Sequence, residues 1–186
     1  ALRREYAHLV PMLEDMKALA EILMQKRDRR GSIDLDVREA KITADGENIE
    51  VSAYERTISH HIIEEFMILA NETVAEFLAG YELPCVYRVH EKPSEEKAAG
   101  FQAYLQELGV RADFRPENVR PGEYGKILEK LEESELFRVV NRVMLRSMMK
   151  AKYSAENGGH FGLASRCYCH FTSPIRRYPD LVVHRL

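Results

Sequence analysis

Two long stretches of the chain carry apolar residues at the spacing of an amphipathic helix. The first covers residues 2–30, ends in a basic cluster and is followed by Gly31, a residue that commonly terminates helices. The second covers residues 57–78, where apolar side chains recur every three or four positions. Basic side chains also interact favourably with the C-terminal end of a helix dipole. The pattern therefore predicts two long helices, each with one buried face.

Between these two stretches the apolar period changes from helical to alternating. Ile33, Leu35 and Val37 alternate with polar residues, and the Asp45-Gly46 pair separates this run from a second one, ENIEVSAY. Two alternating runs joined by an Asp-Gly pair are typical of a β-hairpin. We therefore expect a strand–turn–strand unit between the two long helices.

The second half of the chain predicts shorter elements. A short strand at 85–90 precedes a helix that begins after Ser94, a good N-cap, and ends near Gly109. A loop leads to a helix that ends at Leu131, and a further helix is expected from 135 to about 153. This order of elements predicts an α+β class, mostly helices packed on a few short mixed or antiparallel strands.

The final stretch of the chain, HFTSPIRRYPDLVVHRL at 170–186, contains a Ser-Pro pair followed by two adjacent arginines. Serine is a good N-cap and proline suits the first helical position, so Ser173 and Pro174 predict the start of the last helix. The N–H groups of its first turn would point at one spot, where Arg176 could bind an anion in bidentate fashion. The sequence thus suggests a phosphate or carboxylate site.

The neighbours of Arg176 fit this interpretation but do not require it. Thr172 and Ser173 would add hydroxyl groups, and Arg177 would add a second cation. The alternative, which spacing alone favours, is a capped helix whose arginines form surface ion pairs. These residues by themselves leave both interpretations open.

Composition limits the class of protein without naming a function. The chain has 186 residues, of which 45% are hydrophobic and 31% charged, as in one ordinary domain or a large piece of one. A formal net charge of -3 argues against a uniformly basic nucleic-acid binder, although a local basic groove remains possible. No apolar run approaches the roughly 20 residues of a membrane span. The start without Met and the abrupt end suggest a fragment cut at both termini.

The cysteines and histidines near the end of the chain resemble a zinc site only superficially. The chain has three cysteines, an odd number that does not indicate a disulfide framework and fits a reducing cytoplasm. Cys167, Cys169 and His170 lie close to His160, but structural zinc sites favour two to four residues between paired cysteines and need a second matching pair. We therefore expect no metal site in this chain.

A basic stripe is predicted on the helix expected from 135 onwards. Arg138, Arg142, Arg146 and Lys150 recur every fourth residue and would share one face. Such a stripe could follow the phosphates of a nucleic acid, or it could be a solvated face paired with nearby glutamates. Both interpretations remain open.

Several blocks of the chain, taken in order, resemble the ribonuclease R / ribonuclease II family, that is, the RNB catalytic domain, and most closely its ribonuclease R branch. The strongest likeness lies in GHFGL at 159–163 followed by HFTSPIRRYPDLVVHR at 170–185. Further blocks in the family order are RGSIDLDVREAK (30–41), IIEEFMILAN (62–71), YRVHEKPSEEK (87–97) and VMLRSMMKAKY (143–153).

The resemblance implies a processive 3′-to-5′ exoribonuclease that hydrolyses single-stranded RNA to nucleoside 5′-monophosphates with Mg²⁺ held by aspartates. Those aspartates belong upstream of this chain, so residues 1–186 are expected to be a partial RNB domain, truncated at both ends and without a cold-shock or S1 module. The fragment alone is expected to bind no metal and to be inactive. The expected partner is the 3′ end of single-stranded RNA in the cytoplasm, with no membrane contact and with oligomeric partners unknown.

The resemblance also implies roles for single residues. Arg176 matches the arginine that contacts the phosphate at the reacting bond, and Glu64 matches a glutamate that contacts the ribose near the 3′ end. Leu35 stands where related proteins often carry a phenylalanine that stacks on a base, which leucine cannot do. Arg177, Thr172 and Ser173 would be neighbours of the phosphate, and Tyr178 could either stack on the RNA or pack in the protein.

Two other classes remain as alternatives to the enzyme. The first is a non-catalytic RNA-binding module that keeps the wall of the channel but has lost the aspartates; the residues upstream of Ala1 in the parent protein would distinguish it. The second is a structural helical domain whose arginines serve packing, and it predicts no preference for RNA over DNA.

Overall fold

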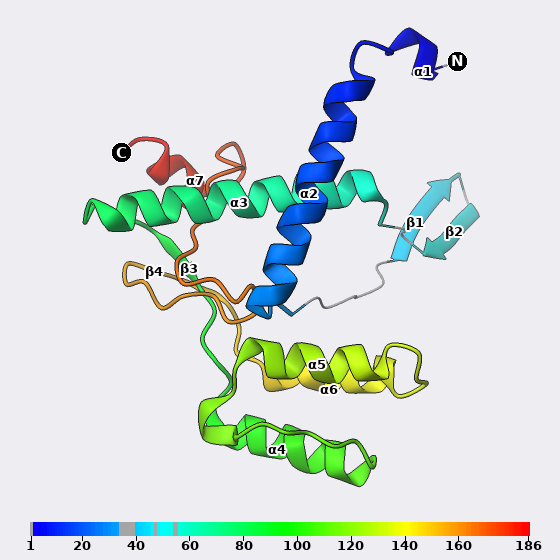
Figure 1. Ribbon diagram of the computed structural model, residues 1–186, viewed down its shortest axis with the longest axis vertical. Coiled ribbons are helices and arrows are strands. Elements are labelled where there is room, and N and C mark those ends of the chain that lie inside the picture. Colours follow the sequence, from blue (N-terminus) through cyan, green and yellow to red (C-terminus); the bar gives the residue numbers. More distant parts are fainter. Residues whose placement is uncertain (1, 34–39, 47, 54–55) are drawn as a thin grey trace.

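The computed structural model describes residues 2–33, 40–46, 48–53 and 56–186 (Figure 1). Within these residues the strands pair in antiparallel fashion and helices predominate, so the predicted α+β class is confirmed. The elements in chain order are α1 (Leu2–Glu5), α2 (Val10–Arg30), β1 (Ala40–Asp45), β2 (Asn48–Ala53), α3 (Ile58–Gly80), β3 (Tyr87–Val89), α4 (Glu95–Glu107), the 3₁₀ turn η1 (Pro116–Asn118), α5 (Pro121–Leu131), α6 (Phe137–Ser147), β4 (Lys152–Ser154) and α7 (Tyr178–Val183).

The first long helix is interrupted near its start. A turn at residues 6–9 separates α1 from α2, whereas the sequence predicted one helix over 2–30. Pro11 explains the break, because it occupies the start of α2 and has no N–H to donate to the carbonyl of Ala7. The predicted end is confirmed: Gly31 has a φ of 88°, in the left-handed region that favours glycine, and its N–H bonds the last turn.

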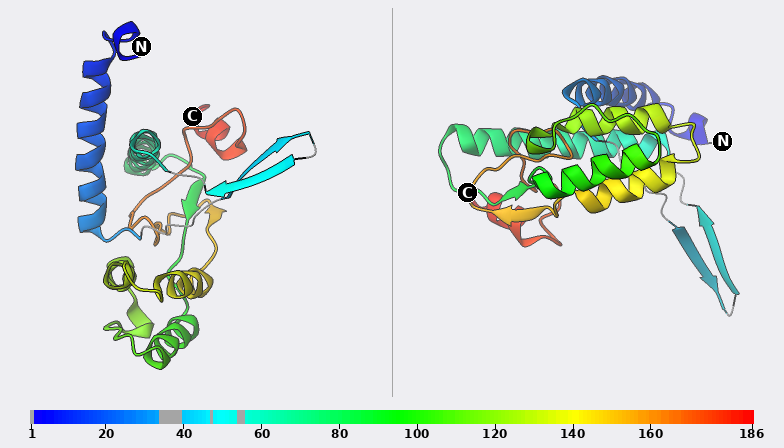
Figure 2. Two further views of the ribbon diagram at one scale, coloured as in Figure 1. Left: turned by 90° about the vertical axis from the view of Figure 1, so that its right-hand side faces the viewer. Right: turned by 90° about the horizontal axis from the view of Figure 1, so that it is seen from below.

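Strands β1 and β2 form the predicted hairpin. They pair in antiparallel register from Ala40–Ala53 to Asp45–Asn48, and Gly46 takes a φ of 61° in the connecting turn. Ile33, which the alternating pattern placed in the first strand, is instead a buried residue that follows the end of α2. Leu35 and Val37 lie outside the described residues. The hairpin projects from the rest of the molecule in all three views (Figures 1 and 2).

The second long helix is confirmed as α3, and two ion pairs join its middle to the end of α2. Arg27 pairs with Glu65 at 2.9 Å, and their side chains are only 9% and 3% exposed. Arg30 forms a bidentate pair with Glu72, at 3.1 and 2.7 Å. Because removal of either partner of the Arg27–Glu65 pair would leave a buried charge unpaired, this pair strongly favours the observed crossing of the two helices.

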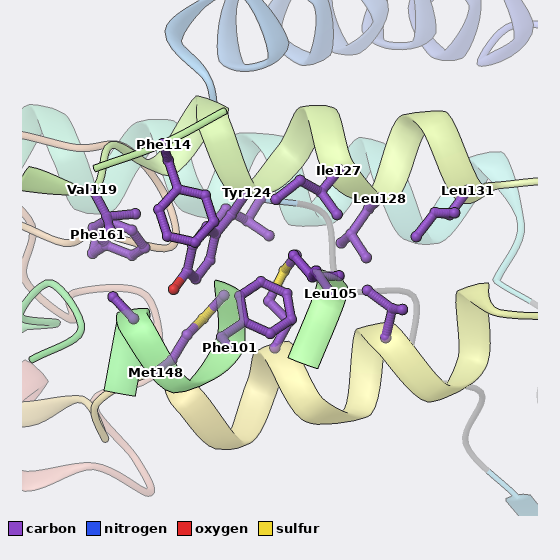
Figure 3. Packing of buried hydrophobic residues seen from close by; sticks show 14 residues of the cluster. Phe101, Leu105, Phe114, Val119, Tyr124, Ile127, Leu128, Leu131, Met148 and Phe161 are labelled. Carbon is purple, nitrogen blue, oxygen red and sulfur yellow. The ribbon is translucent and has the colours of Figure 1, made fainter. Parts of the chain in front are cut away.

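Helices α4, α5 and α6 form a three-helix unit around one apolar cluster. Ser94 caps α4 as predicted, because its hydroxyl accepts the N–H of Lys97. In Figure 3, side chains from these helices point toward one another around Phe101 and Tyr124, whose rings lie 5.2 Å apart. The buried members are Ile33, Ala98, Phe101, Leu105, Phe114, Val119, Tyr124, Ile127, Leu128, Leu131, Val140, Met144, Met148 and Phe161.

The last helix of this unit is shorter than predicted. Instead of continuing to about residue 153, α6 ends at Ser147, and the chain re-enters the sheet at Lys152–Ser154 to pair with β3. Met148 turns to an extended conformation with a ψ of 157° and is buried in the apolar cluster. The helix-forming tendency of this methionine-rich run is therefore overridden by tertiary contacts.

The end of the chain packs against α3 as a second, smaller cluster. Its buried members come from α3, the strand region 85–89, the segment 167–169 and α7. The prediction that Ser173 caps the final helix is wrong, because α7 begins at Tyr178 and residues 174–176 form a turn. Pro179 accounts for part of the difference: a helix running through it would leave the carbonyl of Ile175 without its N–H donor. Among the described residues, no helix is long and apolar enough to cross a bilayer.

Candidate nucleic-acid interface

The segment 171–177, called the closing turn below, is held in place by two buried polar side chains. The N–H of Phe171 donates to Oδ1 of Asn71 on α3 at 2.9 Å. The N–H of Ser173 donates to Oδ1 of Asp180 on α7 at 2.8 Å. Asn71 is 2% exposed and Asp180 is fully buried. Two directional hydrogen bonds, one to α3 and one to α7, therefore fix the backbone at the start of the turn.

Asp180 also binds the guanidinium of Arg177, the residue next to the turn's exposed arginine. Nη2 of Arg177 lies 2.7 Å from Oδ1 of Asp180 and 3.5 Å from the hydroxyl of Thr172. Burial alone would raise the pKa of Asp180, but the hydrogen bonds from Arg177 and from the Ser173 N–H outweigh it and hold this pKa below its ordinary value. Asp180 is therefore ionised at neutral pH, and Arg177 serves it as a counter-ion.

Two side chains of the closing turn, and the first residue of α7 after it, are exposed to solvent. Arg176 is exposed, Ile175 is fully exposed, and Tyr178 at the start of α7 is 76% exposed. The N–H groups of Arg176 and Arg177 both donate to the carbonyl of Ser173, which closes the turn. The two arginines thus lie in different environments. Arg177 is held in the interior by Asp180, and Arg176 is exposed at the surface, where it can contact a ligand.

Tyr178, which the sequence could assign neither to packing nor to stacking, lies in a different environment from Tyr168. The hydroxyl of Tyr168 accepts a hydrogen bond from Nδ2 of Asn71 at 2.9 Å, and burial raises its pKa. Tyr168 is therefore part of the packing that positions Asn71. Tyr178 is exposed beside Arg176 and is free to contact a ligand.

Glu64 lies on the same helix as Asn71 but nearer its N-terminus. Its carboxylate forms an ion pair with Arg56, and its Oε2 lies 3.8 Å from Nδ1 of His61. Its side chain is 33% exposed, in contrast to the neighbouring Glu65, which is buried against α2. Seven residues separate Glu64 from Asn71, a distance of roughly 10 Å along a helix. Within the described residues, no hydrogen bond or ion pair joins Glu64 to the closing turn.

A row of aromatic and imidazole rings connects the closing turn to the three-helix unit. The hydroxyl of Tyr153 and Nδ1 of His170 lie 2.8 Å apart, and His160 lies edge-on to both Tyr168 and His90. Burial lowers the pKa of His160 to about 3, with help from the neighbouring His90. Burial also lowers the pKa of His170 to about 4, with Arg177 as the next cause. Both rings are therefore neutral at pH 7.

The cysteine and histidine residues of this region do not form a cation site. Cys85, Cys167 and Cys169 are buried free thiols. Burial raises the pKa of Cys167 to about 11, which opposes the thiolate form that binds metals. Across the part of the chain that the structure describes, no group of three or more His, Cys, Asp or Glu side chains could hold a metal ion. The resemblance places the aspartates that hold Mg²⁺ outside this chain, so we derive no step through a metal from the described residues.

The structure brings together some of the residues that the sequence singled out and separates others. Thr172, Ser173 and Arg177 meet around Asp180, and Arg176 projects from the same turn. Leu35 lies outside the described residues. Sequence reasoning missed Asp180, although an acidic residue three positions after Arg177 is a usual sign of an ion pair within one helical turn.

Comparisons with known proteins agree with this geometry. The chain matches the RNB domain over residues 2–186. It is 48% identical to ribonuclease R of Aquifex aeolicus over its whole length but spans only 26% of that protein. Its fold superposes on the Mycoplasma genitalium RNase R in complex with ribose-methylated single-stranded RNA with a TM-score of 0.90 and 31% identity, covering 95% of this chain and 28% of that one.

A more distant structural neighbour is yeast Ssd1, described as a pseudonuclease. It superposes with a TM-score of 0.60 and 29% identity over 70% of this chain and 16% of its own. The match to the RNB domain nevertheless extends from residue 2 to residue 186, through both the closing turn and α3. This chain therefore belongs to the RNB domain family.

Proposed function

We propose that the protein carrying this chain is an exoribonuclease that hydrolyses single-stranded RNA processively from its 3′ end to nucleoside 5′-monophosphates. Residues 1–186 would be part of its RNB catalytic domain, inactive alone, with Mg²⁺ held by aspartates outside this chain. The observation that carries the proposal is the closing turn, which buried side chains hold in place while Arg176 stays exposed. Ribonuclease R relatives with up to 48% identity over the whole chain support it.

The geometry suggests a division of labour among the residues of this surface. The exposed guanidinium of Arg176 would bind the phosphate next to the reacting bond and stabilise the charge that develops there. Arg177, paired with Asp180, would orient the turn, and the hydroxyls of Thr172 and Ser173 would lie beside the phosphate. Tyr178, with its ring 76% exposed, would stack on a base.

Glu64 would contact the ribose and favour RNA over DNA through the 2′-hydroxyl. Its carboxylate is partly exposed, and Arg56 and His61 hold it in position, which supports this role. The three buried free thiols support the expectation of a reducing compartment and hence of a cytoplasmic location.

The proposal is tested with the full-length protein, 5′-labelled single-stranded RNA and Mg²⁺. A ladder of products that shortens from the 3′ end would support the enzyme, and Arg176→Ala should slow the shortening by roughly a hundredfold or more. Arg176→Lys keeps the charge but not the bidentate geometry, so its rate of RNA shortening should lie between those of the unchanged protein and Arg176→Ala. Arg111→Ala removes an exposed arginine in the loop after α4 and should have no effect. Equal rates for Arg176→Ala and the unchanged protein would remove this arginine from the chemistry.

A second candidate is an RNA-binding module without activity, which the likeness to the yeast pseudonuclease favours. It predicts that the full-length protein binds RNA but shortens none, and that Arg176→Ala weakens this binding. A run of closely spaced aspartates upstream of Ala1 in the parent protein would favour the enzyme instead.

A further inference from the structure

A large cleft lies between the end of α2, the three-helix unit and the glycine-rich loop that precedes the closing turn. Its lining comes from residues 28–32, from α5 and α6, and from 157–166, and its volume is about 2030 Å³. Sites for small molecules typically measure about 300–1,000 Å³, so this cleft is large enough for a stretch of polymer. Neither Glu64 nor any residue of the closing turn lines it.

The cleft is basic although the chain as a whole is acidic. Eight lysine or arginine residues line it against four aspartate or glutamate residues, whereas the formal net charge of the chain is -3. His90 and His160 also line the cleft, but burial lowers the pKa of both rings, so they add no charge at pH 7. The positive charge of the cleft at pH 7 therefore comes from its lysine and arginine side chains.

Several of these cations are available to a ligand. Arg138 and Arg142 on α6 and Arg166 in the glycine-rich loop are exposed. Within the described residues, none of the three is joined to a carboxylate by an ion pair, whereas Arg30 at the opposite wall is held by Glu72. Unpaired guanidinium groups around a cleft are suited to phosphate groups spaced along a strand.

The structure also divides the basic stripe that the sequence predicted. Arg138 and Arg142 line the cleft, but Arg146 in the last turn of α6 does not, and Lys150 lies beyond the end of the helix. Phe137, at the start of α6, also lines the cleft and adds an aromatic residue beside the cations. Cations interleaved with aromatic rings are typical of sites for single-stranded nucleic acid.

We propose that this cleft binds the phosphate backbone of a single nucleic-acid strand, at nucleotides other than those that contact Arg176. The positive charge of the cleft is the reason to expect that it binds a strand. That this strand is the RNA substrate rests on the proposed function. The cations would grip phosphates and not riboses, so the cleft would hold RNA and DNA of equal length with equal strength. Selection for RNA would be left to Glu64.

The proposal is tested on the full-length protein with a double variant, Arg138→Gln/Arg142→Gln, and a matched control, Arg146→Gln/Lys150→Gln. Both remove two positive charges from exposed positions in the same part of the chain, and only the first pair lines the cleft. Affinity for fluorescent single-stranded RNA and for DNA of the same length is measured from 50 to 300 mM salt, without Mg²⁺. Melting curves establish that both variants fold.

The cleft variant should bind RNA and DNA more weakly by the same factor, roughly three- to tenfold near 0.1 M salt. Its plot of log affinity against log salt should lose about 1.4 from the slope, the value for two phosphate contacts to a single strand. The control should behave like the unchanged protein. Equal losses in the two variants, no loss in either, or a loss for RNA without a loss for DNA would each overturn the proposal.

This binding experiment is independent of the proposed activity. The full-length protein could shorten no RNA while its cleft variant shows the expected loss of affinity. That result would refute the proposed exoribonuclease activity and support the proposed binding in the cleft. A protein that shortens RNA at the same rate and affinity with and without the two cleft arginines would refute the cleft and leave the enzyme.

Discussion

The three-helix unit is held together by a cluster of fourteen buried apolar side chains around Tyr124. The closing turn, in contrast, is fixed to α3 and α7 by hydrogen bonds to Asn71 and Asp180. Apolar burial is strong but non-directional, and it tolerates small shifts in the positions of atoms. Hydrogen bonds inside a protein require particular distances and angles. The larger apolar cluster of the chain therefore lies in one region, and hydrogen bonds position the exposed arginine in the other.

A cavity in the three-helix unit should have the largest effect on the free energy of unfolding and the smallest effect on the rate of RNA shortening. Phe101 is 2% exposed, and Phe101→Ala should lower the free energy of unfolding by about 3–5 kcal/mol. The rate of RNA shortening by the folded full-length protein should stay unchanged well below the melting temperature. Denaturant unfolding and product ladders measure the two quantities, with Gln106→Ala, exposed on the same helix, as the control. Slower RNA shortening by folded Phe101→Ala protein would show that the three-helix unit also affects function, contrary to this prediction.

Removal of the Asp180 carboxylate should affect function more than stability. Asp180→Ala leaves the Arg177 guanidinium and the Ser173 N–H without their acceptor, and should lower the free energy of unfolding by about 3 kcal/mol. It should also slow RNA shortening because the closing turn is no longer fixed. Asp180→Asn keeps one oxygen acceptor and should be intermediate in both respects.

The matched control for Asp180 is Val183→Ala, which truncates a buried apolar side chain of the same helix. At temperatures where the two alanine variants are equally folded, only Asp180→Ala should have a reduced kcat/KM for RNA. If kcat/KM falls by the same factor in both variants, Asp180 has only a structural role, and the closing turn does not differ from the three-helix unit in its effect on function.

The histidines between the two regions predict a weaker, pH-dependent effect. His160 and His170 have pKa values lowered to about 3 and about 4, whereas an unfolded histidine titrates near 6.5. Between these values the unfolded chain binds more protons, so stability falls as the pH falls from about 6.5 toward 4. The slope is at most about 1.4 kcal/mol per pH unit for each histidine.

Melting temperatures between pH 7.5 and 4.5 measure this dependence. His160→Asn retains an oxygen that can accept the N–H of Leu163 but cannot be protonated, so its melting temperature should fall less steeply toward acid pH. His8→Asn changes a histidine that is exposed and is the matched control. An identical slope in all three proteins would show that the buried rings are not responsible for it.

Local sequence signals were sufficient wherever an element depends on its own residues. Ser94 caps α4, Gly31 ends α2 in the left-handed conformation, and the Asp45-Gly46 pair connects two antiparallel strands, all as predicted. Capping, left-handed glycine and hairpin turns involve residues a few positions apart, and their chemistry can be read from the sequence. The family blocks were equally local, and the match over residues 2–186 confirmed them.

The sequence by itself determined the helical periods, the caps and the family, but the tertiary structure alone decided how the candidate site is assembled. The sequence pointed to Ser173 as a helix cap, whereas its N–H is taken by Asp180 and the helix begins at Tyr178. Asn71 reaches Phe171 across a separation of 100 residues, and no local pattern encodes such a contact. Directional hydrogen bonds between distant segments depend on how those segments pack, and packing is a property of the whole fold.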